Sequence, residues 1–143
     1  LFQLYREAAR RAGHDPATLK TSINVHGFIA DTTEIAADQF YGPQAAVMDR
    51  IGRERGWGPT SRAHYDQARG PTGNLFVGDP ERVAEKIVAA HKVFGNDRFL
   101  IQMAIGLMPH DQIMRGIELY GTKVAPLVRK ALTGSADGAK PAA

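Results

Sequence analysis

The sequence predicts an α/β fold in which short apolar strands alternate with amphipathic helices. Residues 75–77 form a short apolar run that leads directly into a helix start. Residues 99–105 are almost continuously apolar, which is typical of a parallel strand covered on both faces. A helix with a single apolar stripe is expected between these two strands. This order indicates the closing β/α units of a barrel whose opening units are absent from the sequence.

Signals at both ends define the helix between these strands. Asp79 is placed to accept a hydrogen bond from the free amides of a first helical turn, and Pro80 suits the first helical position. Gly95 can adopt the left-handed conformation that follows many helices. We therefore expect a helix over residues 80–94, and a last amphipathic helix over about residues 113–128.

The first half of the chain predicts one more strand between two helices. Residues 4–12 have a helical pattern, and residues 22–30 are expected to form the first strand. A capping signal at residues 31–34 predicts a second helix that ends near residue 52. Residues 53–74 are rich in Gly, with only a weak helical pattern in their second half. Connections of this length are usually functional lids or disordered segments, and we interpret this one as a lid.

The predicted strands are too few for a closed barrel. A complete eight-stranded barrel takes roughly 250 residues, whereas this chain has 143. We assign residues 1–132 to one barrel segment that includes the lid, and residues 133–143, which are small and polar, to a disordered tail. An incomplete sheet exposes an edge, so we expect the chain either to belong to a larger protein or to form a homo-oligomer.

Composition and charge exclude several classes of function. The sequence contains no Cys, so disulfides and thiolate metal sites are ruled out. Its formal net charge of +3 is spread over single Arg and Lys residues without a basic stripe, and we therefore expect no nucleic-acid partner. No apolar run is long enough to span a membrane and no secretory pattern is present, which favours a cytoplasmic protein without a membrane partner.

Two motifs carry a family resemblance. They are Val-Gly-Asp-Pro-Glu at residues 77–81 and, in the last helix, Glu-Leu-Tyr followed by Val-Ala-Pro, at residues 118–120 and 124–126. Their order, with a Gly-rich lid before the short strand, resembles the C-terminal end of the bacterial luciferase-like flavin-dependent oxidoreductases. The resemblance covers nearly the whole chain. It implies a (β/α)8 TIM barrel that binds reduced FMN, or in some members the deazaflavin F420, at the carboxyl-terminal mouth of its strands.

The same resemblance directs attention to the first strand. Asn24, His26 and Phe28 alternate onto one of its faces, which would approach the mouth if it points into the barrel. The alkanesulfonate monooxygenase branch of the family carries Arg-x-His on the matching strand. Asn24 replaces that Arg, so a sulfonate-like anion is not favoured as substrate, because a neutral amide offers no charge-assisted hydrogen bond. His26 is a pocket candidate, and the alternative is a hydrogen-bonded core histidine.

The lid supplies a second group of candidates. Arg69 precedes Gly70 and Gly73, which would permit a hinge, and its guanidinium could close over an anionic group of flavin or substrate, as a matching Arg-Gly-Gly loop does in the sulfonate branch. A solvated surface arginine is the alternative. Trp57 and Arg62 could serve the same closed lid, although their spacing supports no particular geometry.

The strand at residues 99–105 and the turn after it complete the candidate pocket. Gln102 is the polar exception in an apolar strand, and a flavin ring edge could satisfy its amide. Met108 stands where the sulfonate branch has a Tyr, so that phenolic contact is missing. The sequence assigns no catalytic residue. It also shows no metal site, because its histidines share no spacing with carboxylates.

Taken together, these residues predict part of a flavin-dependent oxidoreductase that performs monooxygenation or hydride transfer on a small organic substrate. A flavin reductase is an expected partner, and the isolated segment is expected to be inactive. The alternative is a non-catalytic binding or assembly module that self-associates through its sheet edge. Another phosphate-binding barrel would instead be indicated by affinity for a phosphosugar without affinity for flavin.

Overall fold

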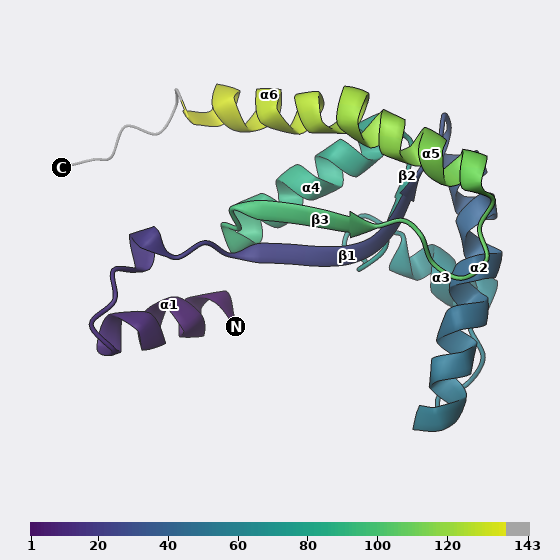
Figure 1. Ribbon diagram of the computed structural model, residues 1–143, viewed down its shortest axis with the longest axis horizontal. Coiled ribbons are helices and arrows are strands. Elements are labelled where there is room, and N and C mark those ends of the chain that lie inside the picture. The colour runs from purple at the N-terminus through teal and green to yellow at the C-terminus, as the bar shows by residue number, and fades with distance from the viewer. Residues whose placement is uncertain (137–143) are drawn as a thin grey trace.

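The computed structural model describes residues 1–136 and confirms the α/β class. In chain order its elements are α1 (Phe2–Arg11), η1 (Pro16–Thr18), β1 (Ser22–Ile29), α2 (Thr33–Arg55), α3 (Arg62–Ala68), β2 (Phe76–Gly78), α4 (Pro80–Phe94), β3 (Arg98–Gln102), α5 (His110–Leu119), η2 (Tyr120–Val124) and α6 (Ala125–Ala136). Figure 1 shows the parallel strands β1 and β3 side by side, with α4, α5 and α6 on one side of them.

The sheet has the order β2-β1-β3, and both outer strands run parallel to β1. β3 pairs with residues 22–26 of β1, whereas β2 pairs only with residues 27–29 at its carboxyl end. β1 and β3 are therefore direct neighbours, and β2 is a short additional strand at one end of β1. Among residues 1–136 the structure thus has the three strands that the sequence predicted, and the segment 76–78 forms the shortest of them.

Local signals placed α4 correctly. Its bounds match the predicted helix over residues 80–94, with Asp79 as the N-cap and Gly95 in the left-handed conformation at φ 59°. Asp79 accepts a hydrogen bond from the backbone N–H of Arg82 at 2.9 Å and another from the Thr33 hydroxyl at 2.5 Å. Since Thr33 opens α2, this pair joins the N-termini of α2 and α4 at the carboxyl end of β1 and β2.

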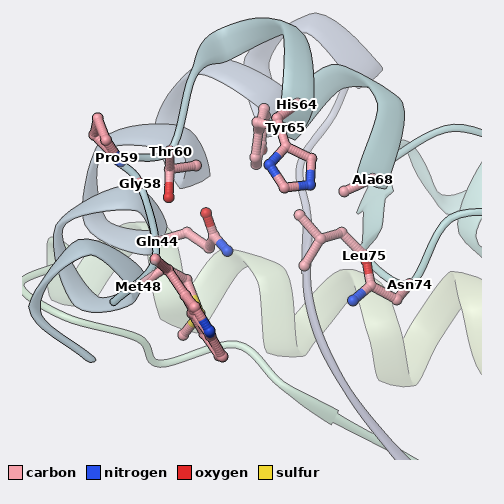
Figure 2. Close-up of a pocket in the computed structure, with 11 residues that line it drawn as sticks. Gln44, Met48, Gly58, Pro59, Thr60, His64, Tyr65, Ala68, Asn74 and Leu75 are labelled. Carbon is pink, nitrogen blue, oxygen red and sulfur yellow. The ribbon is translucent and has the colours of Figure 1, made fainter. Parts of the chain in front are cut away.

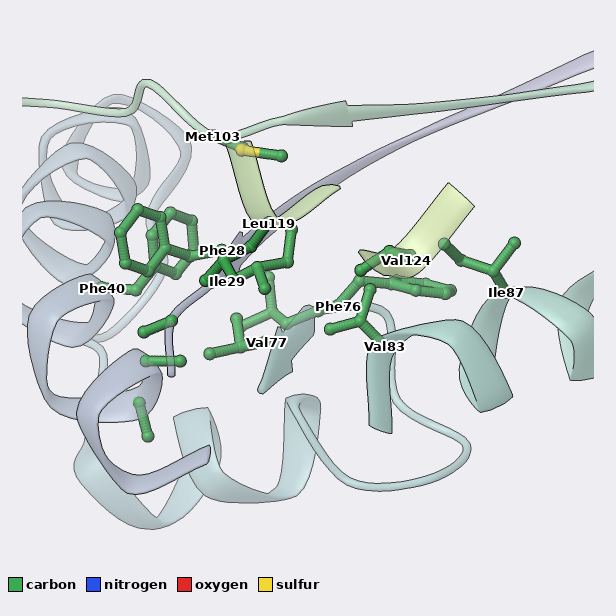
Figure 3. Close-up of a cluster of buried hydrophobic side chains, with 14 of the residues drawn as sticks. Phe28, Ile29, Phe40, Phe76, Val77, Val83, Ile87, Met103, Leu119 and Val124 are labelled. Atoms are coloured by element: carbon green, nitrogen blue, oxygen red, sulfur yellow. The ribbon is translucent and has the colours of Figure 1, made fainter. Parts of the chain in front are cut away.

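The hydrophobic core lies where β1 and β2 meet α2, α4 and α5 (Figure 3). The rings of Phe28 on β1 and Phe40 on α2 are stacked with centroids 5.8 Å apart, and both side chains are buried. Gly116 allows α5 to approach β1 closely, since a Cβ on Gly116 would lie 3.1 Å from the carbonyl oxygen of Ile29. These contacts fix the positions of α2 and α5 against the carboxyl end of β1.

Two helices extend beyond their expected bounds. α2 ends at Arg55, and α3 occupies the weak helical pattern that lies inside the expected lid at residues 53–74. α6 continues to Ala136, so the first residues of the expected tail at 133–143 are helical. The rest of that expected tail lies outside the described residues.

Candidate functional site

One face of the β1–β3 pair is left open by the helices and carries three of the candidate residues. Asn24 is paired with Leu100 and His26 with Gln102, and residues paired across parallel strands point to the same side of a sheet. Asn24 and Gln102 are exposed, Leu100 is 49% exposed and His26 is partly buried. We call this surface, formed by Asn24, His26, Leu100 and Gln102, the open face.

Two other candidates lie elsewhere. Phe28 continues the alternation of Asn24 and His26, but its side chain is only 1% exposed and packs against Phe40 in the core. The reason is local, because α2 and β2 cover β1 from Gly27 onward. Met108, in the segment that follows β3, is partly buried against the same core.

The connection between β1 and α4 contains α2, α3 and β2 and starts at the carboxyl end of β1. Figure 1 shows α2 standing across this end of the sheet. Its middle also reaches the segment after β3, since a Cβ on Gly106 would lie 2.9 Å from the carbonyl oxygen of Pro43. In barrel enzymes, substrates bind at the carboxyl ends of the strands, in the loops that follow them. The connection therefore lies where an active site would be built.

A cleft of about 440 Å³ lies within this connection, between α2 and the segment 57–75 (Figure 2). Gln44, Tyr65 and Leu75 form its floor and are at most 6% exposed, whereas Trp57 at its rim is 55% exposed. We call it the lid cleft. Tyr65 is fixed there by a hydrogen bond from its hydroxyl to the carbonyl of Ala37 at 3.0 Å, and burial raises its pKa to about 12.

The arginines of the expected lid are engaged in ion pairs. Arg62 donates to Asp38 of α2 at 2.8 Å, which links α3 to α2. Arg69 donates from Nε to Asp66 at 2.7 Å, and its side chain is 21% exposed. This hydrogen bond from Arg69 holds the pKa of Asp66 below its usual range. The structure thus places Arg69 in an ion pair within the expected lid.

The turn that carries Gly70 and Gly73 is closely packed. A Cβ on Gly73 would lie 1.9 Å from the carbonyl oxygen of Ala68, so only glycine fits. Lys86 of α4 donates to the carbonyl oxygens of Gly70 and Leu75, each at 2.6 Å. Sequence reasoning missed this lysine, although its position three residues after Val83 on the apolar stripe of the helix was a usable signal.

Gln44 was also missed. It lies one turn after Phe40 and one turn before Met48 on α2, and is therefore a polar residue within an apolar stripe. Within residues 1–136, no group of three or more His, Asp or Glu side chains is placed to hold a metal ion. None of the helices in this part of the chain is long and apolar enough to cross a membrane.

The structure is similar to solved monooxygenases. Monooxygenase RslO1 from Streptomyces bottropensis has a TM-score of 0.66 and 22% identity, covering 87% of this chain and 36% of its own. The oxygenating constituent of 3,6-diketocamphane monooxygenase from the CAM plasmid of Pseudomonas putida, in complex with FMN, has a TM-score of 0.59 and 23% identity, covering 87% and 38%. Long-chain alkane monooxygenase LadA has a TM-score of 0.58 and 18% identity, covering 91% and 33%.

At these identities the comparison establishes the fold. The chain has the architecture of part of the barrel found in these monooxygenases, which confirms the resemblance read from the sequence at the level of fold. It spans between 33% and 38% of the length of each. No protein-family model and no curated protein matches the chain.

Proposed function

We propose that this chain is part of a luciferase-like flavin-dependent oxidoreductase and contributes the open face and the lid to its active site. The observation that carries the proposal is the position of Asn24, His26 and Gln102 on one open face of a strand pair, next to an inserted connection at the carboxyl end of the strands. The fold supports it, because a similar structure was solved with FMN. FMN is therefore the favoured cofactor, with F420 as the alternative.

We assign the ring part of a flavin to the open face because of the hydrogen-bonding groups that this face carries. Asn24 and Gln102 each present an amide, and His26 an imidazole, so together they can both donate to and accept from the polar edge of a ring. Reduced flavin supplies a hydride or the electrons that activate oxygen. The role that we assign to His26 and Gln102, which are paired across the strands, is to orient a substrate against that ring.

Three groups that could hold the phosphate of FMN are already engaged within the protein. Arg69 is paired with Asp66, and Arg115 is paired with Asp31 and Glu118. The N-terminus of α4, which would attract an anion, is already capped by the carboxylate of Asp79. We infer that the phosphate is held by another part of the protein, as the resemblance implies.

The proposal is tested by titrating FMN and F420 into the intact protein that carries this chain. We expect one of them to bind, and His26→Ala and Gln102→Leu to lower turnover of a substrate. Ser22→Ala, at the exposed start of β1, is the matched control and should change neither binding nor turnover. Failure of both cofactors to bind would overturn the proposal and favour the non-catalytic assembly module.

Arg69 needs a separate experiment, because it can close over an anionic group only by leaving Asp66. If it does so, Arg69→Ala should weaken flavin or substrate binding by about 1.5–3 kcal/mol, the range for a lost charge-assisted bond. Thermal stability should change little, since a partly exposed ion pair contributes about 1 kcal/mol at most. Unchanged affinity would remove Arg69 from the site. The cytoplasmic location, the flavin reductase and the homo-oligomer stay predictions.

A further inference from the structure

The outer side of α4 forms a groove with α6. Val83 and Ile87 of α4 are buried in the core, and at about 100° per residue Glu85 and Lys92 lie on the opposite side of the helix. A groove of about 400 Å³ lies there, between α4 and α6, which Figure 1 shows on the same side of the strands. We call it the outer groove. Its lining includes Glu81, Glu85, Val88, Ala89 and Lys92 of α4 and Leu127 of α6.

The outer groove stays accessible when the barrel is completed. In a (β/α)8 barrel the helices form a ring around the strands, and additional strands and helices join the sheet at its edges. The groove lies on the side of α4 that faces away from the strands, so the larger protein would still present it at its surface. Its occupant must therefore come from outside the barrel.

The charged groups of the outer groove lack partners within the chain. Glu81 and Glu85 are exposed and lie one helical turn apart, so their carboxylates repel each other. Lys92 is exposed and lies seven residues after Glu85, which is about 10 Å further along the same side of the helix. In the described part of the chain, none of these three side chains forms an ion pair or a hydrogen bond. The groove thus has an acidic end and a basic end, both unneutralised.

Apolar side chains lie between and beside these charged ends. Ala89 is exposed, Val88 is partly buried, and Leu127 of α6 is 36% exposed. Val93, one turn after Ala89, is 75% exposed. A contiguous apolar strip with a charged rim is typical of a surface that contacts another protein. The small side chain of Ala89 would let a second helix approach closely.

We propose that the outer groove is a dimer interface, in which two copies of this protein pack their α4 helices antiparallel around a two-fold axis between Val88 and Ala89. Glu85 and Lys92 lie equally far from this axis on either side of it. Glu85 therefore faces Lys92 of the partner subunit, and the same ion pair forms a second time by symmetry. A parallel arrangement would instead place like charges together. The inference goes beyond the proposed function, because it concerns only the outer helices.

Sedimentation equilibrium of the intact protein measures this association. We expect the parent to form a dimer. Lys92→Glu should raise the dissociation constant of the dimer roughly tenfold or more, since both symmetric pairs change from attraction to repulsion. Glu85→Lys combined with Lys92→Glu exchanges the two charges and should restore the parent affinity to within about threefold. Arg50→Glu makes the same change of charge at an exposed position of α2 outside the groove, and should leave the dimer unchanged.

Cross-linking in the parent protein locates the contact without any variant. A carbodiimide joins a carboxylate to an amine only where the two groups touch. Isotope-labelled and unlabelled protein are mixed, cross-linked, digested and studied by mass spectrometry. We expect a cross-link between Glu85 of one isotope and Lys92 of the other, which can form only between two copies.

Three outcomes would overturn the inference. The first is a monomeric parent at every soluble concentration. The second is a dimer that persists unchanged in Lys92→Glu, which would place the contact on another surface such as the sheet edge. The third is the absence of the mixed-isotope cross-link from a parent that does form dimers. Thermal melting of each variant accompanies the sedimentation, and an unfolded Lys92→Glu leaves the decision to the cross-link in the parent.

Discussion

Lys86 allows a quantitative test of how the lid is attached to the barrel. Its ammonium group donates to the carbonyl oxygens of Gly70 and Leu75 and lies 4.9 Å from the centre of the Phe76 ring. The residue is 9% exposed. Burial, with a smaller contribution from the nearby charge of Arg82, lowers the pKa of Lys86 from 10.5 to about 8.

The lowered pKa of Lys86 has a defined sign in the stability of the protein. Between the folded pKa of about 8 and the unfolded value of 10.5, the unfolded chain binds more protons, so stability rises with pH in this window. At about 1.4 kcal/mol per pKa unit, the full effect is at most about 3 kcal/mol. Roughly 2 kcal/mol of it should be visible between about pH 7.5 and pH 9.5. Higher pH is avoided because Tyr65, whose pKa is raised to about 12, would act in the opposite direction above about pH 10.

Urea unfolding of the intact protein at several pH values measures this change. The parent should gain stability across the window, and Lys86→Met should lose that gain, because it carries no titrating group. Lys92→Met, at an exposed position of the same helix, should behave like the parent. The reasoning is refuted if the parent and Lys86→Met show the same dependence on pH, since the ammonium would then not be desolvated in the folded protein.

Three further predictions follow from the core, a helix cap and the lid. Phe40→Ala removes a fully buried ring stacked on Phe28 and should cost about 3–5 kcal/mol in urea unfolding, with a value below 1 arguing against this packing. Asp79→Ala should cost about 1–2 kcal/mol, and that cost should vanish in acid, where the carboxylate of the parent is protonated and its cap is lost. Hydrogen exchange should be fast at Gly58, for which the described contacts include no backbone hydrogen bond, and slow at Leu75, whose N–H donates to the carbonyl oxygen of Ala68 at 3.0 Å; equal exchange at both would contradict the anchoring of the turn.

The ends of helices could be predicted from the sequence where a single capping residue determines them. Asp79 and Gly95 fixed both ends of α4 because capping depends on the nearest few residues. The direct pairing of β1 with β3 was not readable, since it joins segments more than seventy residues apart. For the same reason the alternation of Asn24 and His26 was informative, but their meeting with Gln102 required the register.

Burial was harder to predict than position along a strand. Alternation grouped Phe28 with Asn24 and His26. In the structure, however, α2 and β2 cover β1 from Gly27 onward, and the ring of Phe28 packs against Phe40 in the core. Gln44 gave no signal beyond being polar in an apolar stripe. Whether such a side chain finds a partner depends on every element packed around it, and here the surrounding segment is irregular.

The contacts at the two ends of the inserted connection explain how the connection is attached to the rest of the fold. At the barrel side, Thr33 and Asp79 join the starts of α2 and α4, and Lys86 holds the turn that leads into β2. These contacts hold the buried floor of the lid cleft in place. The rim near Trp57 is exposed and is held by α2, since the N–H of Trp57 donates to the carbonyl oxygen of Gly52 at 2.9 Å and the N–H of Thr60 donates to Asp49 at 2.7 Å. The floor of the cleft is therefore anchored to α4 through Lys86, whereas the rim is anchored to α2 through Trp57 and Thr60.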